Sequence, residues 1–357
     1  MKVWKAGLVA LLAAILTIVT ACSSGKPPKE AVVSAMSKMS ELKSYTVQGT
    51  FGFDDVVIPE GVAGDSAEAA GVTAVANMLK GSTISYKGTY QADPMRTDMT
   101  LDFKMGGDGS SFNLSIPMIV TPEKVWIKVP AIPGVPLPEE ISGKFVELDL
   151  KKLAEQSGQE VAMPDTAVTQ KMGQDMAKIL LDNFDEKSYF SEPKAEEVKD
   201  LPADLKPDQI VRFAITQQNF DEAITTIVDK VAPQIIDLLL TNEEYLKTLQ
   251  LTKADLEEAK KELASKEDSE IKKGIEEMKK SLKVNELSLT GAIKDDYLTY
   301  QDVRANLEMT EEAQTIKLGM HLLMTYDNLN KDVKFENEIP KDAVPFEQLI
   351  EMFGGGL

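Results

Sequence analysis

Much of the chain alternates between apolar and polar residues with a period of two, which predicts β-strands that bury one face. The first run, 47–53, places Val47, Phe51 and Phe53 on one side and polar or small residues on the other. The same pattern recurs over 84–90, 99–105, 112–118, 125–129, 144–150, 209–217, 287–293, 303–309 and 316–326, with a short edge strand at 333–335. Because only one side of each run is apolar, the pattern excludes a doubly wound parallel sheet, whose strands are apolar on both sides.

Other stretches repeat apolar residues every three or four positions, which predicts helices. These stretches span 29–42, 165–185, 219–240, the Lys- and Glu-rich block 252–282 and a final turn at 346–353. In the helix over 219–240, Asn219 is a candidate N-cap and Pro233 is expected to introduce a kink. The block 252–282 reads as one or two solvated helices. The Ala- and Gly-rich stretch 54–81 fits a loop or a weak helix equally well.

Turn signals at Asp93-Pro94 and 106–109 favour antiparallel pairing of successive strands. We therefore predict an α+β fold built on one curved antiparallel sheet of about ten or eleven strands, a half-barrel whose concave apolar face is covered by the helices. Residues 29–357 would form this single domain, with the charged helical block at about 252–282 as an insertion.

The amino terminus has the features of an export signal. Lys2 and Lys5 precede an uncharged, mostly apolar run that ends at Thr20, and this run is shorter than the roughly 20 residues of a membrane-spanning helix. It ends in Val19-Thr20-Ala21-Cys22, which resembles the lipobox of bacterial lipoproteins. We predict a signal peptide over 1–21, lipidation of Cys22 and a tether over 22–28. A plain signal peptide with a chance cysteine, or an uncleaved anchor, is the alternative.

Charge and cysteine content narrow the function classes. The formal net charge is −19, and a surface of that sign repels nucleic acid and anionic headgroups. Membrane attachment is therefore expected through the lipid anchor, at the outer face of the bacterial cell membrane. Cys22 is the only cysteine, which excludes intramolecular disulfides and thiol redox pairs.

Two local motifs carry a resemblance to a known class of proteins. They are Leu42-Lys43-Ser44-Tyr45 at a helix-to-strand junction, and Tyr326-Asp327-Asn328-Leu329-Asn330, followed by Val333 and Ile339-Pro340, at the last strand. With the order of elements, they resemble the LolA/LppX-type half-barrel lipoproteins and related membrane lipoproteins of Gram-positive bacteria. The resemblance implies a short amino-terminal helix, an incomplete antiparallel barrel plugged by helices, and a cavity that carries lipids or lipoproteins.

The sequence contains no motif that names an enzyme. It has no G-x-S-x-G elbow, no H-E-x-x-H and no Walker loop. His321, the single histidine, shares a strand side with Lys317 and Thr325 and is expected to face solvent. Acidic pairs such as Asp295-Asp296 lack EF-hand spacing. We therefore assign no catalytic residue, no metal site and no cofactor.

Two features are candidates for binding. Methionines are enriched on the predicted apolar side of the sheet, and methionine suits a surface that must fit varied apolar ligands. The predicted ligand-facing residues are Met99, Phe103, Met105, Met118, Met309, Met320 and Met324. An ordinary core sealed by helices would show the same residues. The proline-rich loop 130–138 fits a rim, a partner contact or a rigid connector.

These features favour a non-enzymatic binding or carrier module for an apolar, lipid-like ligand. The alternative is a structural lipoprotein with a solid core that contacts another envelope protein, unidentified from the sequence, through its acidic helices. An envelope hydrolase is the third hypothesis, and no nucleophile and base can be named for it.

Overall fold

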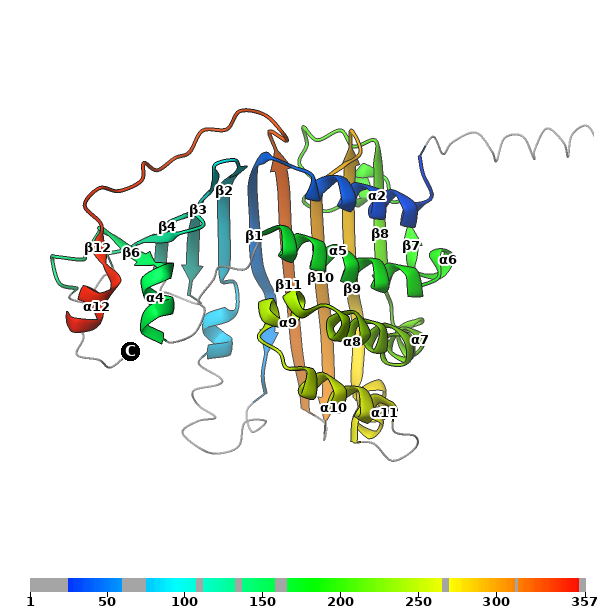
Figure 1. Ribbon diagram of the computed structural model, residues 1–357. Helices are drawn as coiled ribbons and strands as arrows, with labels where there is room; N and C mark the ends of the chain where they lie inside the picture. The colour runs from blue at the N-terminus through cyan, green and yellow to red at the C-terminus, as the bar shows by residue number, and fades with distance from the viewer. Residues whose placement is uncertain are drawn as a thin grey trace, which may run out of the picture.

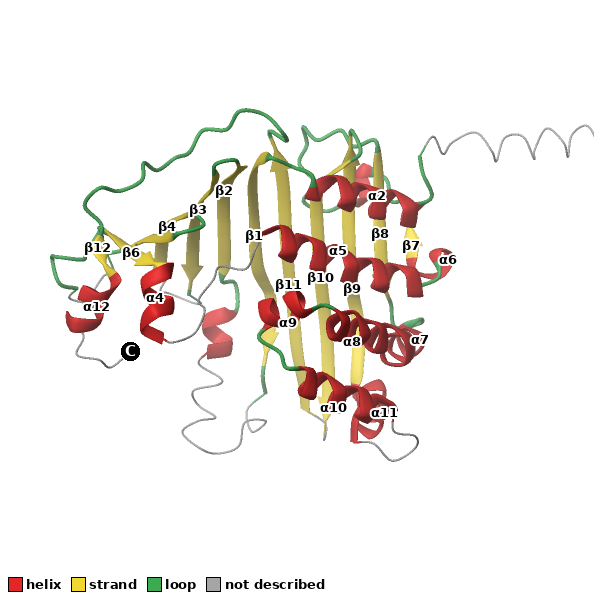
Figure 2. Cartoon of the chain, in the orientation of Figure 1, coloured by secondary structure: helices red, strands yellow, loops and turns green. Residues whose placement is uncertain are grey.

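The computed structural model of the protein describes residues 25–59, 75–106, 112–131, 137–157, 166–264, 270–311 and 314–352. Over these ranges it is an α+β fold organised around one large sheet that does not close on itself (Figures 1 and 2). The predicted signal peptide, the lipobox, Cys22, residues 60–74 and residues 132–136 lie outside the described ranges. Within those ranges, no helix is both long and apolar enough to cross a membrane.

The sheet contains twelve strands within the described residues, in the order β12-β6-β5-β4-β3-β2-β1-β11-β10-β9-β8-β7. Neighbours are antiparallel, except for the short parallel pair β12 and β6. The strands are β1 (Ser44–Val57), β2 (Thr83–Ala92), β3 (Met95–Met105), β4 (Phe112–Val120), β5 (Lys124–Lys128), β6 (Phe145–Asp149), β7 (Phe190–Ser191), β8 (Gln209–Ile215), β9 (Leu282–Lys294), β10 (Tyr297–Glu311), β11 (Gln314–Asp327) and β12 (Val344–Pro345).

The sheet consists of two meanders joined at its middle. Strands β1 to β6 form one meander and β7 to β11 the other, and the seam between them is the antiparallel pair of β1 and β11. In this pair Thr46 lies opposite Asp327. The two motifs that carry the family resemblance meet at the same end of the sheet, where Asn330 donates its backbone N–H to the carbonyl oxygen of Ser44 (2.8 Å) and its side-chain oxygen accepts from Lys43 N–H (2.8 Å).

The strand registers place the apolar residues on one face of the sheet, as the alternation predicted. Phe51 lies opposite Ile84 on one side and Leu322 on the other, and Ile84 lies opposite Phe103. Residues opposite one another in a ladder point to the same face. The intervening positions, such as Asp302 and Thr290, form a polar face.

The helices group over the β7–β11 half of the apolar face and beside β6 and β12 (Figure 1). Their bounds are α2 (Pro28–Ser40), α4 (Leu150–Ser157), α5 (Thr166–Asn183), α6 (Glu186–Tyr189), α7 (Phe220–Thr226), α8 (Ala232–Thr241), α9 (Glu243–Leu249), α10 (Lys253–Ala264), α11 (Glu270–Ser281) and α12 (Phe346–Met352), with a 3-10 turn, η1, at Ala195–Glu197. The largest core cluster joins Ala35 of α2, Ala223 of α7 and Val231 to Val211 and Ile293 of the sheet. Within the described part of the charged block, α10 and α11 are the two helices, and Leu282 already begins β9.

Two local predictions need correction, and a third is specified further. Residues 333–335 form no strand. Their segment crosses the polar face and contacts it through isolated hydrogen bonds, such as that from Asn337 N–H to Asp98 (3.0 Å), and not through a strand ladder. Asn219 does precede α7, but its side-chain oxygen accepts from Thr216 N–H (2.7 Å) rather than from the helix. The predicted helix over 219–240 is interrupted just before Pro233 by the π-helical turn η2 (Ile227–Val231), and both a proline and a π-helical turn are usual places for a helix to bend.

Candidate functional site

The candidate site is a cavity of about 410 Å³ between the helices α2 and α5 and the apolar face of the sheet. We refer to it as the α2–α5 cavity. Its volume falls within the ~300–1,000 Å³ of typical small-molecule sites. The lining residues are Val32, Met36, Met39 and Ser40 of α2, Gln170, Gly173 and Gln174 of α5, Tyr45 of β1, Leu289 and Gly291 of β9, Leu298 and Gln301 of β10, and Tyr326 of β11.

The spacing of residues in α2 and α5 places the cavity roof. Met36 lies four residues after Val32, and Met39 lies three residues after Met36, so all three lie on one side of α2. In α5, Gly173 has no side chain to fill the space, and a Cβ built on it would meet no atom within 4 Å. Gln174 Nε2 donates to the carbonyl oxygen of Met36 (3.2 Å) and ties the two helices together.

The floor of the cavity is the sheet itself. Leu298 is 5% exposed and lies across Gly291, where a Cβ would come within 2.6 Å of the leucine Cδ1. Leu289 points to the same face, yet it is 37% exposed. An apolar side chain that is this open on a helix-covered face indicates that the helices do not pack tightly onto β9 at this point.

Tyrosines line one end of the cavity. The rings of Tyr45 and Tyr326 meet edge to face with centroids 5.6 Å apart, and the Tyr45 ring also contacts Tyr90 at 5.1 Å. Burial raises the pKa of Tyr45 to about 12, and Tyr326 and Tyr90 add to the rise. Burial likewise raises the pKa of Tyr326. These rings therefore stay neutral around pH 7 and offer apolar faces with polar hydroxyl tips.

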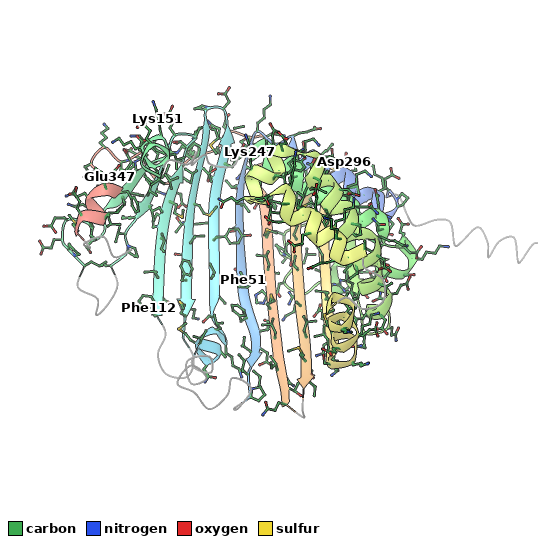
Figure 3. The ribbon with its side chains drawn as sticks, turned by 60° about the horizontal axis from the view of Figure 1, so that its bottom comes forward. Phe51, Phe112, Lys151, Lys247, Asp296 and Glu347 are labelled. Carbon is green, nitrogen blue, oxygen red and sulfur yellow. The ribbon has the colours of Figure 1, made fainter. Side chains whose placement is uncertain are left out.

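The apolar face is less covered over β1–β4 than over β8–β11. Phe51, Ile84, Leu101, Phe103 and Ile116 all point to this face and are only partly buried. Figure 3 shows these strands uncovered between the helices over β9–β11 on one side and α4 and α12 on the other. The same apolar face therefore continues from the α2–α5 cavity into a more open stretch.

All seven predicted ligand-facing residues lie on the apolar face. Met99 pairs with Met118 and Met105 with Phe112, whereas Met320 pairs with Ala305 and Met324 with Gln301. Phe103 and Met309 share this face with them. None of the seven is among the residues that line the α2–α5 cavity.

The sequence prediction missed the residues that do line it. Met36 and Met39 fall within the helix predicted over 29–42, and Tyr45 and Tyr326 fall within the two resemblance motifs, but none of the four is among the predicted ligand-facing residues. The signal that was present is the tyrosine in each motif, because two tyrosines at the adjoining ends of paired strands lie side by side.

His321 lies on the polar face, opposite the apolar residues as predicted, and its side chain is 18% exposed there. It packs over Gly52, where a Cβ would come within 2.7 Å of the imidazole Cε1, and its Nδ1 lies 2.9 Å from an oxygen of Asp54.

Among the described residues, no three acidic, histidine or cysteine side chains are grouped so that they could hold a metal ion.

No charged side chain is among the described residues that line the cavity. Its polar members are amides and hydroxyls, which orient a bound molecule by hydrogen bonds without carrying charge. No protein-family model matches this chain, and no curated protein matches it either, so the geometry of the chain itself has to carry the functional argument.

Proposed function

We propose that the protein is a membrane-anchored extracytoplasmic lipoprotein of the bacterial envelope that binds or carries an apolar, lipid-like ligand and is not an enzyme. In this proposal the sheet is a half-barrel, α2 and α5 cover part of its concave face, and the ligand lies in the α2–α5 cavity. The anchor is the predicted lipid on Cys22.

The α2–α5 cavity is the observation that carries the proposal. It combines apolar walls from Val32, Met36, Leu289 and Leu298 with uncharged polar groups at Gln170, Gln174 and Gln301. Such a site favours a molecule with a long apolar part and a small polar part. The flexible thioethers of Met36 and Met39 adapt to chains of different shape.

The open stretch over β1–β4 supports the same reading. Its half-buried apolar side chains are continuous with the cavity floor through β1 and β11. A ligand longer than the cavity has apolar surface to follow in this direction, and burial of such surface stabilises a complex by roughly 25 cal/mol per Å².

Filling the cavity tests the proposal directly. A leucine in place of Gly173 projects into the open space at the α5 side of the cavity, so we expect Gly173→Leu to lose bound ligand. The measurement is native mass spectrometry of protein purified from membranes, with denaturing spectra of the same sample to subtract any covalent lipid. Wild-type protein should carry a non-covalent apolar mass, and the variant about tenfold less of it.

Gly274→Leu is the matched control, because Gly274 is an exposed glycine of α11 with equally free surroundings. This variant should keep the ligand. A wild-type protein without any bound apolar mass, or equal occupancy in Gly173→Leu and wild type, would falsify the carrier proposal and favour a structural lipoprotein with a filled core.

A further inference from the structure

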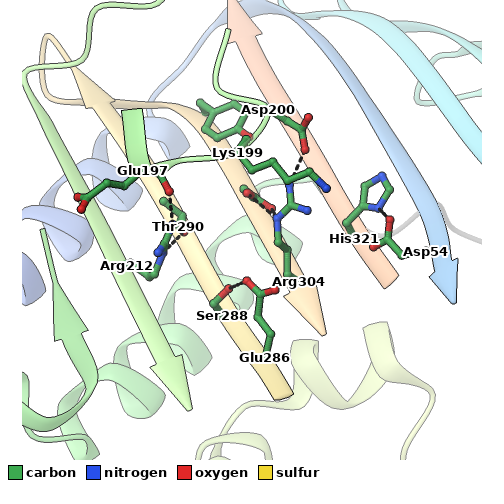
Figure 4. A network of polar contacts seen from close by, with 12 residues as sticks. Asp54, Glu197, Lys199, Asp200, Arg212, Glu286, Ser288, Thr290, Arg304 and His321 are labelled. Carbon is green, nitrogen blue, oxygen red and sulfur yellow. Dashed lines mark hydrogen bonds and ion pairs between the residues drawn. The ribbon is translucent and has the colours of Figure 1, made fainter. Parts of the chain in front are cut away.

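A second hollow, of about 420 Å³, lies on the polar face of the sheet (Figure 4). It is on the opposite side from the α2–α5 cavity, because Asp302 alternates along β10 with Gln301, which lines that cavity. The segment between β7 and β8 passes beside it, where Tyr300 Oη donates to the carbonyl oxygen of Lys199 (3.4 Å). We call this site the β9–β10 hollow.

Asp302 is a buried carboxylate at the wall of the hollow. Its side chain is 3% exposed, and Arg304 Nε lies 2.9 Å from Oδ1 and 3.0 Å from Oδ2. The N–H of that guanidinium has hydrogen-bond geometry only toward Oδ2, and Oδ1 accepts a hydrogen bond from no residue that the structure describes. Buried carboxylate oxygens are normally paired, so Oδ1 is a place for an incoming donor.

A second arginine–aspartate pair in the same sheet shows what normally completes such a site. Asp98 of β3 is also buried, at 4% side-chain exposure, and accepts from Arg96 Nε (3.0 Å), two residues away on its own strand. Its other oxygen accepts from the backbone N–H of Asn337 (3.0 Å). The chain therefore supplies both donors at Asp98, whereas at Asp302 the described residues supply one.

The charges around Asp302 favour a cation. Arg304 is shared between Asp302 and Asp200 (2.7 Å), and Glu286 stands near them. Burial raises the pKa of Asp302, Arg304 opposes the rise, and Glu286 and Asp200 add to it. Asp302 and Asp200 thus share one guanidinium, and Glu286 adds a third negative charge near Asp302. Arg212 and Lys199 also border the hollow, but Arg212 donates to the hydroxyl of Thr290 (2.9 Å), and the four lining carboxylates outnumber the three lining cations.

We propose that the β9–β10 hollow binds a primary ammonium group, which donates a hydrogen bond to Asp302 Oδ1 and offsets the excess carboxylate charge. An ammonium carries three N–H donors, and the hydroxyl oxygens of Ser288 and Thr290 together with Glu286 border the same hollow as further acceptors. The site therefore requires a ligand that has both a positive charge and an N–H donor. It is independent of the apolar cavity and of the proposed function.

Three small probes separate these two requirements. Ethanolamine provides the ammonium and its N–H groups, choline provides the charge without N–H, and glycerol provides hydroxyl donors without charge. We expect calorimetric titration of the full chain to show saturable binding of ethanolamine and at least about tenfold weaker binding of choline and glycerol. Equal binding of choline or glycerol, or no binding of ethanolamine, overturns the proposal.

The variants assign the binding to Asp302. Asp302→Asn should weaken ethanolamine binding about tenfold or more, and Asp98→Asn, the matched buried aspartate, should leave it unchanged. Equal losses in both variants would show a general loss of structure and overturn the assignment. If Asp302→Asn does not fold, Glu286→Gln at an exposed position provides the test, with an expected loss of about threefold and an unchanged affinity as the contrary result.

Discussion

Tyr45 and Tyr86 show how single residues set the character of the apolar face. The Tyr86 ring lies across Gly49, where a Cβ would come within 2.5 Å of the tyrosine hydroxyl oxygen. Any side chain at position 49 would therefore collide with this ring and, more closely still, with the backbone carbonyl oxygen of Leu323 on β11. Burial raises the pKa of Tyr45 and of Tyr86 to about 12, which places uncharged phenols where a charged side chain would repel an apolar ligand.

These tyrosines make the stability of the fold sensitive to alkali. A tyrosine whose pKa is raised in the folded state binds its proton more tightly there than in the unfolded chain, whose tyrosines ionise near pH 10. The contribution of such a tyrosine to the free energy of unfolding is therefore complete below about pH 10 and is lost as the pH rises toward 12.

We expect Tyr45→Phe to remove part of this alkaline loss. Between about pH 9 and about pH 11.5, the free energy of unfolding of the wild type should fall by up to about 2 kcal/mol more than that of the variant. Urea unfolding at the two pH values, with tyrosinate absorbance as a second readout, makes the comparison. Identical slopes for the two proteins would show that Tyr45 is not buried as described.

Among the elements, α10 is informative because its composition suggests a free helix. It is dense in Lys and Glu, yet Leu256 is 8% exposed and belongs to a cluster with Leu239 of α8 and Tyr245 of α9. Tyr245 is in turn held by Asp175 of α5 (2.7 Å). Leu256, with Ala259 and Leu263 partly buried beside it, thus docks the charged helix onto the helices that cover the sheet.

We expect Leu256→Ala to lower the free energy of unfolding by about 2–4 kcal/mol, the usual cost of emptying a buried leucine site. The control is Leu249→Ala, because Leu249 is 38% exposed and surface changes stay within about 0.5 kcal/mol. Equal small effects in both variants, measured by urea unfolding at neutral pH, would mean that α10 is undocked.

The elements themselves were largely predictable, because their signals are local. The alternation over 316–326 gave a strand that matches β11 (Gln314–Asp327), and the period of the first helix gave α2. The edge strand predicted at 333–335 was wrong, because a run of three alternating residues is too short to distinguish a strand from an irregular segment. The two-residue strand β7 was too short to leave a pattern.

The site was much less predictable than the strands. Its lining comes from α2, α5 and four strands that are widely separated in the sequence, so no local pattern brings Met36, Gly173 and Leu289 together. The methionines of the prediction lie on the same face of the sheet as the α2–α5 cavity, but not at the part of that face that the helices leave hollow. Only the packing of α2 against α5 decides this, and packing depends on tertiary contacts.

At the scale of the whole molecule, the fold begins close to the predicted anchor. Gln209 Nε2 donates to the carbonyl oxygen of Lys26 (2.8 Å), and Lys29 Nζ donates to the carbonyl oxygen of Phe184 (3.1 Å). Lys26 follows Cys22 by four residues, which span at most about 14 Å when extended. A lipid on Cys22 would therefore hold the edge of the sheet near β8, and α2 with it, close to the bilayer.

We expect Cys22→Ser to release the protein from the membrane fraction, because two or more acyl chains supply lasting attachment and the acidic surface supplies none. Palmitate labelling and cell fractionation give the readout. Retained label and unchanged membrane association in the variant would refute lipidation at this residue.

The seam between β1 and β11 also sets the timing of assembly. Thr46 and Asp327, which face each other across it, are 281 residues apart. The central ladder therefore cannot form until Asp327 has been synthesised and has emerged, and pairing at such long range folds slowly. Until the hairpin of β10 and β11 arrives, the early meander has an unpaired edge at β1, and such an edge is a ready template for pairing with another chain.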